Sequence, residues 1–142
     1  MDAQGLLLFA HGARDPRWAG PFEAVAARVR QARPQCAVQL AFLEFMTPNL
    51  ADAGAALVAQ GCKVVQVLPL FLGAGGHVRK DLPLLLDALR AAHAGVNFQL
   101  CSAVGEMDTV IHAMADAAVG CLETGLQAGL QEQVLNQPRH QT

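Results

Sequence analysis

Hydrophobic and polar positions along this chain form blocks of two alternating kinds. Segments with apolar residues at helical spacing separate short, mostly apolar runs that predict strands, at residues 6–10, 38–45, 64–70 and 96–101. Because strand and helix patterns alternate, the sequence predicts βα units and a parallel sheet. With right-handed crossovers, we expect an α/β fold: a three-layer α/β/α sandwich whose four-stranded parallel sheet has the order 2-1-3-4.

Residues that are typical of helix starts and helix ends support these predicted elements. Asp15 is typical of a helix N-cap, and Pro16 after it is typical of a first helical position. Thr47 and Pro48 repeat this pattern before the second predicted helix. Gly61 is placed to end that helix. The third strand is continuous and rich in β-branched residues, as expected for a strand that is buried on both faces.

The composition indicates one compact domain with a distinct tail. Of 142 residues, 53% are hydrophobic and only 15% are charged, which excludes a disordered chain. From Glu123 onward glutamines accumulate, while Leu126, Leu130 and Val134 recur every four residues. We therefore divide the chain into a domain at 1–122 and a glutamine-rich tail at 123–142. We expect this tail either to be partly helical and packed against a partner, or to be disordered.

Charge and cysteine content narrow the function classes. A net charge of -2 gives no reason to expect nucleic acid or an anionic membrane as partner. No apolar run reaches the roughly 20 residues of a membrane span, and residues 6–10 are too short for a secretory signal. The cysteines, which form no C-x-x-C pair, indicate reduced thiols in the cytoplasm; they are Cys36, Cys62, Cys101 and Cys121.

Three candidate functional residues follow the first three strands. His11 comes directly after the first strand, Glu44 lies near the end of the second, and His77 lies beyond the third. Neighbouring strands are about 4.8 Å apart, and ligands of such folds bind beyond the carboxyl ends of the strands. We therefore expect these side chains to converge on one metal ion or one reacting atom.

Each candidate also has an ordinary structural interpretation. Either histidine could be a hydrogen-bonded residue at a strand end or in a loop, and Glu44 could cap a helix or pair with an arginine. Glu44 lies in an otherwise apolar segment, where an unpaired carboxylate would cost several kcal/mol. Gly12 beside His11, and the glycines that precede His77, indicate close approach of the backbone and favour a functional site.

Positive charge surrounds this predicted edge of the sheet. The N-terminus of the first helix adds a partial positive charge just past His11. Such a basic rim on a slightly acidic protein suits an acidic small molecule, although ordinary solvated charges would look the same. Its members are Arg14, Arg17, Arg79 and Lys80.

Three segments resemble the short sirohydrochlorin chelatases, which insert cobalt or iron in the cobalamin and sirohaem pathways. They are FAHGARD at 9–15, AFLE at 41–44 and LPLFLGAGGHVRKDLP at 68–83. The third segment is highly specific, whereas the first alone would be weak. The likeness spans about residues 5–120.

The resemblance implies a chelatase-type fold and a division of roles. His11 and His77 would bind the metal and help to deprotonate the macrocycle, with weaker help from the matching Glu44. A divalent ion would be a substrate, with cobalt favoured and iron or nickel possible, and no prosthetic group is expected. Short members pair as homodimers. The carboxylates of the tetrapyrrole would be oriented by Arg14, Arg79 and Lys80.

The chain departs from the family pattern at two places. Ala13 stands where a serine is common, and residues 105–108 lack the proline and histidine often found after the fourth strand. Contacts from the fourth loop are therefore in doubt, while His11, Glu44 and His77 are retained.

One alternative function fits the sequence as well as a chelatase does, and two others fit it less well. A non-catalytic metal or tetrapyrrole carrier could use the same pocket. A histidine phosphatase would need an arginine before the histidine to hold phosphate, and Ala10 stands there. A flavodoxin-like phosphate binder using residues 73–76 lacks a G-x-G-x-x-G or Walker pattern.

Overall fold

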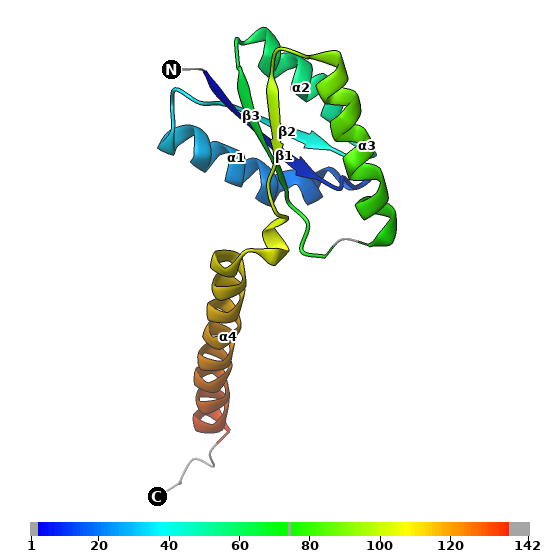
Figure 1. The fold of residues 1–142 in the computed structure, drawn as a ribbon. Coiled ribbons are helices and arrows are strands. Elements are labelled where there is room, and N and C mark those ends of the chain that lie inside the picture. The colour runs from blue at the N-terminus through cyan, green and yellow to red at the C-terminus, as the bar shows by residue number, and fades with distance from the viewer. Residues whose placement is uncertain (1–2, 74, 137–142) are drawn as a thin grey trace, which may run out of the picture. The chain divides into compact units, whose positions relative to one another are not determined.

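A computed structural model describes residues 3–73 and 75–136, and the side chain of His77 lies outside this description. The chain forms two compact units, residues 1–106 and 107–142, which are described separately. The first unit contains one parallel sheet in the order β2-β1-β3-β4, so the predicted fold class and strand order are confirmed (Figure 1). Its strands are β1 Gln4–Ala10, β2 Ala37–Phe42, β3 Val64–Pro69 and β4 Asn97–Leu100.

Side chains of β1 alternate between two apolar layers. Leu7 and Phe9 pack in a core with helices α2 (Leu50–Ala59) and α3 (Gly76–Ala92), while Leu8 packs on the other face against Ala26 of α1 (Gly20–Ala32). Leu7 and Leu8 are fully buried. A central strand covered on both faces explains why its sequence is a continuous apolar run.

The first βα connection begins as predicted. Asp15 caps the short 3-10 helix η1 (Pro16–Ala19), because its Oδ1 accepts a hydrogen bond from the N–H of Arg17 at 3.0 Å. The guanidinium of Arg17 also bonds to this carboxylate, which lowers the pKa of Asp15. The helix α1 follows η1 at Gly20.

The second βα connection differs from the prediction. β2 ends at Phe42 rather than at residue 45, and α2 is capped by Asn49, whose Oδ1 accepts from the N–H of Asp52 at 2.8 Å. The reason is local: the N–H of Phe42 bonds to the carbonyl of Pro48, which closes residues 43–48 into a loop. Thr47 is therefore a loop residue and not the cap.

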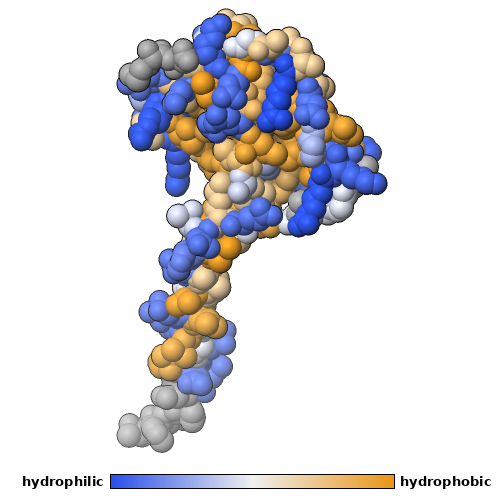
Figure 2. Space-filling model, viewed as in Figure 1, coloured by the Kyte–Doolittle hydropathy of each residue, from blue (hydrophilic) through white to orange (hydrophobic). Residues whose placement is uncertain are grey.

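The second unit is the helix α4, Asp108–Leu135, which passes through the predicted division at residue 122 without a break. That division stays a prediction, and the end of the predicted tail, 137–142, lies outside the described residues. Apolar side chains stay exposed along α4, as Figure 2 shows, and they include Leu122, Leu126, Leu130 and Val134. Within the described chain, no helix combines the length and apolarity needed to span a membrane.

Candidate functional site

The loops that follow β1 and β2 are joined by main-chain hydrogen bonds. The N–H of Leu43 donates to the carbonyl of Ala10 at 2.9 Å, and the N–H of Glu44 donates to the carbonyl of His11 at 3.1 Å. The main chains of His11 and Glu44 are therefore adjacent at the carboxyl edge of the sheet, and convergence of their side chains on one ion stays a prediction.

Glycines allow the loops at this edge to touch. Gly12 has a φ of 88°, and a Cβ atom there would overlap the carbonyl oxygen of Glu44. A second close approach occurs at Gly105 of η2 (Val104–Glu106), where an added Cβ atom would overlap the carbonyl of Leu72. Sequence reasoning identified the close approach at Gly12 and missed the one at Gly105.

The imidazole of His11 packs against an aromatic ring that the sequence reasoning did not single out. The ring centroids of His11 and Phe71 are 4.7 Å apart, and Phe71 is only 3% exposed. Phe71 also contacts Phe9 edge-on, with 5.8 Å between the ring centroids. These contacts restrict the position of the His11 ring, since Phe71 is itself fixed in the core.

Glu44 lies in a different environment from the one expected. It is exposed, two residues beyond the end of β2, so the burial cost predicted from its apolar neighbours does not arise. The two ordinary roles considered for it are also unfilled: Asn49 caps α2, and within the described chain no arginine pairs with Glu44.

The backbone of His77 lies in the first turn of α3, so the ordinary interpretation of His77 as a loop residue is wrong. Its neighbours Val78 and Arg79 line a cavity of about 370 Å³ between α3 and the carboxyl ends of β3 and β4. Phe71 lines this cavity too, so the same ring contacts His11 and the cavity wall. Phe71 therefore links the two places: it contacts the His11 ring, and it lines the cavity next to the first turn of α3.

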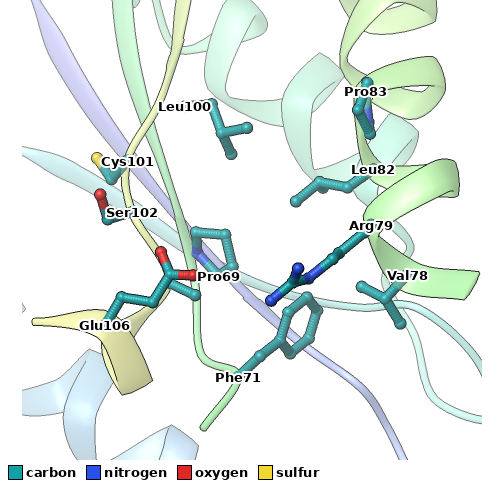
Figure 3. A pocket seen from close by; sticks show the side chains of 11 residues that line it. Pro69, Phe71, Val78, Arg79, Leu82, Pro83, Leu100, Cys101, Ser102 and Glu106 are labelled. Atoms are coloured by element: carbon teal, nitrogen blue, oxygen red, sulfur yellow. The ribbon is translucent and has the colours of Figure 1, made fainter. Parts of the chain in front are cut away.

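The cavity has apolar walls and two opposed charges. Figure 3 shows the guanidinium of Arg79 reaching in from α3, and the carboxylate of Glu106 reaching in from the opposite side. The thiol of Cys101 donates to Oε1 of Gln66 at 3.5 Å, and burial raises its pKa, which keeps this wall uncharged. The remaining lining residues are Pro69, Leu82, Pro83, Leu100, Ser102 and Ala103.

The four basic residues predicted as a rim differ in their surroundings. Arg17 is engaged by Asp15, with 3.0 Å between Nη2 and Oδ2. Arg79 lines the cavity, and Lys80 is exposed on α3. Arg14 places its Cζ 4.6 Å from the ring centroid of Phe45 and has no ion pair within the described chain.

Phe45 has a strained backbone. Its φ of 66° makes it the one non-glycine residue with positive φ in the described part of the chain, and its side chain is 56% exposed. A bulky residue in this conformation costs about 1–3 kcal/mol, whereas an exposed cation–π contact returns about 0.5–1 kcal/mol. Residue type alone gave no signal for this conformation.

The described residues contain no group of three or more His, Cys, Asp or Glu side chains that could hold a metal ion. A closed structural metal site usually has four ligands, whereas a site that exchanges its ion keeps positions open.

Comparison with known proteins identifies the family. The sequence pattern of the family described as CbiX matches residues 5–119. This chain belongs to the CbiX family. A crystal structure of a CbiX protein ascribed to cobalamin biosynthesis, from Marinobacter aquaeolei VT8, has a TM-score of 0.75 and 33% identity. The match covers 85% of this chain and 98% of that one.

Two curated relatives of this CbiX chain are chelatases for different metals. The sirohydrochlorin cobaltochelatase of Saccharolobus solfataricus is 35% identical over 82 residues, which are 58% of this chain and 62% of the relative. The chloroplastic sirohydrochlorin ferrochelatase of Arabidopsis thaliana is 26% identical over 121 residues, 85% of this chain and 54% of the relative. The CbiX chain thus spans little more than half the length of these relatives.

Proposed function

We propose that this CbiX protein is a metal chelatase that inserts a divalent ion into sirohydrochlorin, in cobalamin or sirohaem biosynthesis. Cobalt is favoured as the metal substrate, and iron or nickel is possible. The observation that carries the proposal is the position of Phe71: the His11 ring packs on it, and it lines the cavity beside the first turn of α3, whose backbone includes His77. The printed activities of the two curated relatives support this reaction.

In this mechanism His11 and His77 hold the incoming ion through neutral imidazole nitrogens. Two protein ligands leave coordination positions open for the pyrrole nitrogens, so the ion is bound without being trapped. Imidazole and carboxylate ligands suit cobalt(II), iron(II), nickel(II) and zinc alike, so the ligand set does not select one metal.

Insertion forms nitrogen–metal bonds and releases two pyrrole protons for each divalent ion. An imidazole nitrogen that ligates the ion cannot accept a proton at the same time, so proton transfer needs a histidine after it has released the ion, or a second group. The exposed carboxylate of Glu44 lies in the loop bonded to His11 and supplies weaker assistance as a ligand or as a proton acceptor.

Basic residues orient the carboxylates of the macrocycle in this proposal. Arg79 reaches into the cavity, and Arg14 lies three residues beyond His11 without an ion pair of its own in the described chain. Lys80 on α3 adds a third positive charge. Arginine binds carboxylates through paired N–H groups, which favours Arg14 and Arg79 over the lysine.

Turnover distinguishes the enzyme from a non-catalytic carrier with the same pocket. Sirohydrochlorin and Co²⁺ in large excess over protein should show many insertion events per protein molecule, followed by the absorbance change of the macrocycle. A carrier would stop at one equivalent. Initial rates with Co²⁺, Fe²⁺ and Ni²⁺ in parallel then rank the three metals.

We further propose that the protein acts as a homodimer. The exposed apolar side chains of α4 support a partner on that helix, and Leu126 is 68% exposed. Sedimentation velocity of Leu126→Glu should show a monomer where the wild type is a dimer. Ala128→Glu adds the same charge on the opposite side of α4 and should remain dimeric. Dimeric Leu126→Glu would contradict a role for this helix.

Compartment and cofactors complete the proposal. The four cysteines, all within the described residues, are free thiols, which supports a reducing compartment such as the cytoplasm. The metal is consumed as substrate, and the reaction requires no prosthetic group.

A further inference from the structure

The presence of phenylalanine at position 45 is not explained by a contribution to the stability of the folded chain. Its ring is 56% exposed and its φ of 66° is one that glycine adopts without strain. The exposed contact between its ring and Arg14 is weaker than the backbone strain that accompanies it. Because glycine would adopt this φ without strain, the presence of an aromatic side chain here points to a role other than loop stability.

The contact with Phe45 leaves Arg14 ready for a ligand. Its Cζ lies 4.6 Å from the ring centroid, and a cation–π contact does not consume the N–H groups of a guanidinium. Within the described chain, Arg14 makes no hydrogen bond or ion pair with a carboxylate, in contrast to Arg17, which is bonded to Asp15.

The two residues belong to loops that are fixed to each other. Arg14 follows His11 and Gly12 in the first loop, and Phe45 follows Glu44 in the second. The bond from the Glu44 N–H to the His11 carbonyl, with the tight packing of Gly12, holds these loops together. The Arg14–Phe45 contact extends this junction toward solvent, beside the proposed metal ligand.

We propose that Phe45 is a positioning residue that holds the guanidinium of Arg14 in place to bind a carboxylate of the tetrapyrrole. The inference rests on the proposed function. An unrestrained arginine loses side-chain entropy when it binds a ligand, and contact with the Phe45 ring removes part of this loss in advance. Phe45 thereby strengthens substrate binding and leaves the chemical step unchanged.

The test measures the dissociation constant of metal-free sirohydrochlorin, together with KM and kcat for cobalt insertion. Phe45→Ala should raise the dissociation constant and KM roughly two- to fivefold, the strength of an exposed cation–π contact, with kcat unchanged. Phe45→Tyr should retain wild-type binding because it keeps the ring. Leu84→Ala, at a side chain that is 68% exposed on α3, controls for loss of an exposed apolar group.

Phe45→Gly separates positioning from strain. It removes the ring and also relieves the positive φ, so the chain should unfold at the same or a higher urea concentration while binding weakens as in Phe45→Ala. In the Arg14→Ala background, Phe45→Ala should have no further effect on binding.

Two results would overturn the positioning role: wild-type binding by Phe45→Gly, or full additivity of Phe45→Ala and Arg14→Ala. Failure of the proposed function looks different, because wild-type protein would then fail to insert cobalt at all. An active wild type with insensitive Phe45 variants removes this inference alone.

Discussion

Replacing His11 or His77 with alanine is expected to reduce metal insertion to background, a loss of at least about a hundredfold. The reason is that the two imidazoles are proposed to hold the ion together and to take up the pyrrole protons. The rate is measured by the absorbance of sirohydrochlorin under saturating Co²⁺. Circular dichroism should show that both variants retain the wild-type fold.

His93→Ala provides the matched control for removal of a histidine. His93 is the C-cap of α3, and its ring lies 6.1 Å from that of Phe98, near the beginning of β4 and away from the proposed site. This variant should retain insertion, and Glu44→Ala should slow it less than either His11→Ala or His77→Ala. A His11→Ala, His77→Ala double variant that inserts cobalt at the wild-type rate would end the assignment.

Gly12→Ala is expected to cost at least about 2 kcal/mol of unfolding free energy and most of the insertion activity. Alanine is strained at a φ of 88°, and its Cβ would overlap the Glu44 carbonyl oxygen. The loops carrying His11 and Glu44 must therefore separate, which displaces the proposed metal ligand. Urea denaturation gives the free energy, and steady-state rates give the activity.

Gly61→Ala separates strain from the loop contact. Gly61 has nearly the same φ, 91°, but nothing lies within 4 Å of its added Cβ. Both substitutions restrict the unfolded chain equally, so their difference reports the contact at Gly12. Equal destabilisation by the two variants, with insertion retained in Gly12→Ala, would show that the tight junction of the loops is not required.

The fold was largely predictable because its signals are local and consistent. β1 is an apolar run with both faces buried from Leu7 to Ala10, β3 buries every second residue, and alternating strand and helix patterns indicate a parallel sheet. The end of β2 was not predictable in the same way. Residues 40–46 are almost wholly apolar, yet β2 ends at Phe42, and the N–H groups of Leu43 and Glu44 bond the carbonyls of Ala10, the last residue of β1, and of His11. The hydropathy of a segment does not indicate which carbonyl group each backbone N–H will bond, so it does not define where the strand ends.

The sequence indicated which loops form the candidate site, but it did not indicate the side-chain packing and the backbone conformation within those loops. The positions of His11 and Glu44 follow from parallel strand ends, which lie at one edge of a sheet. The packing of Phe71 on His11 and the strained φ of Phe45 depend on tertiary contacts that no periodic pattern reports. The exact start of α3 at Gly76 has no side-chain capping signal in the sequence, because its N-cap is Gly75.

A crystal of the wild-type protein soaked in Co²⁺ tests the central claim most directly, through anomalous scattering at the cobalt edge. The account predicts one strong peak bonded to imidazole nitrogens of both His11 and His77, at the mouth of the cavity that Phe71 lines. Separate peaks on the two histidines, or a peak that neither one contacts, would contradict it.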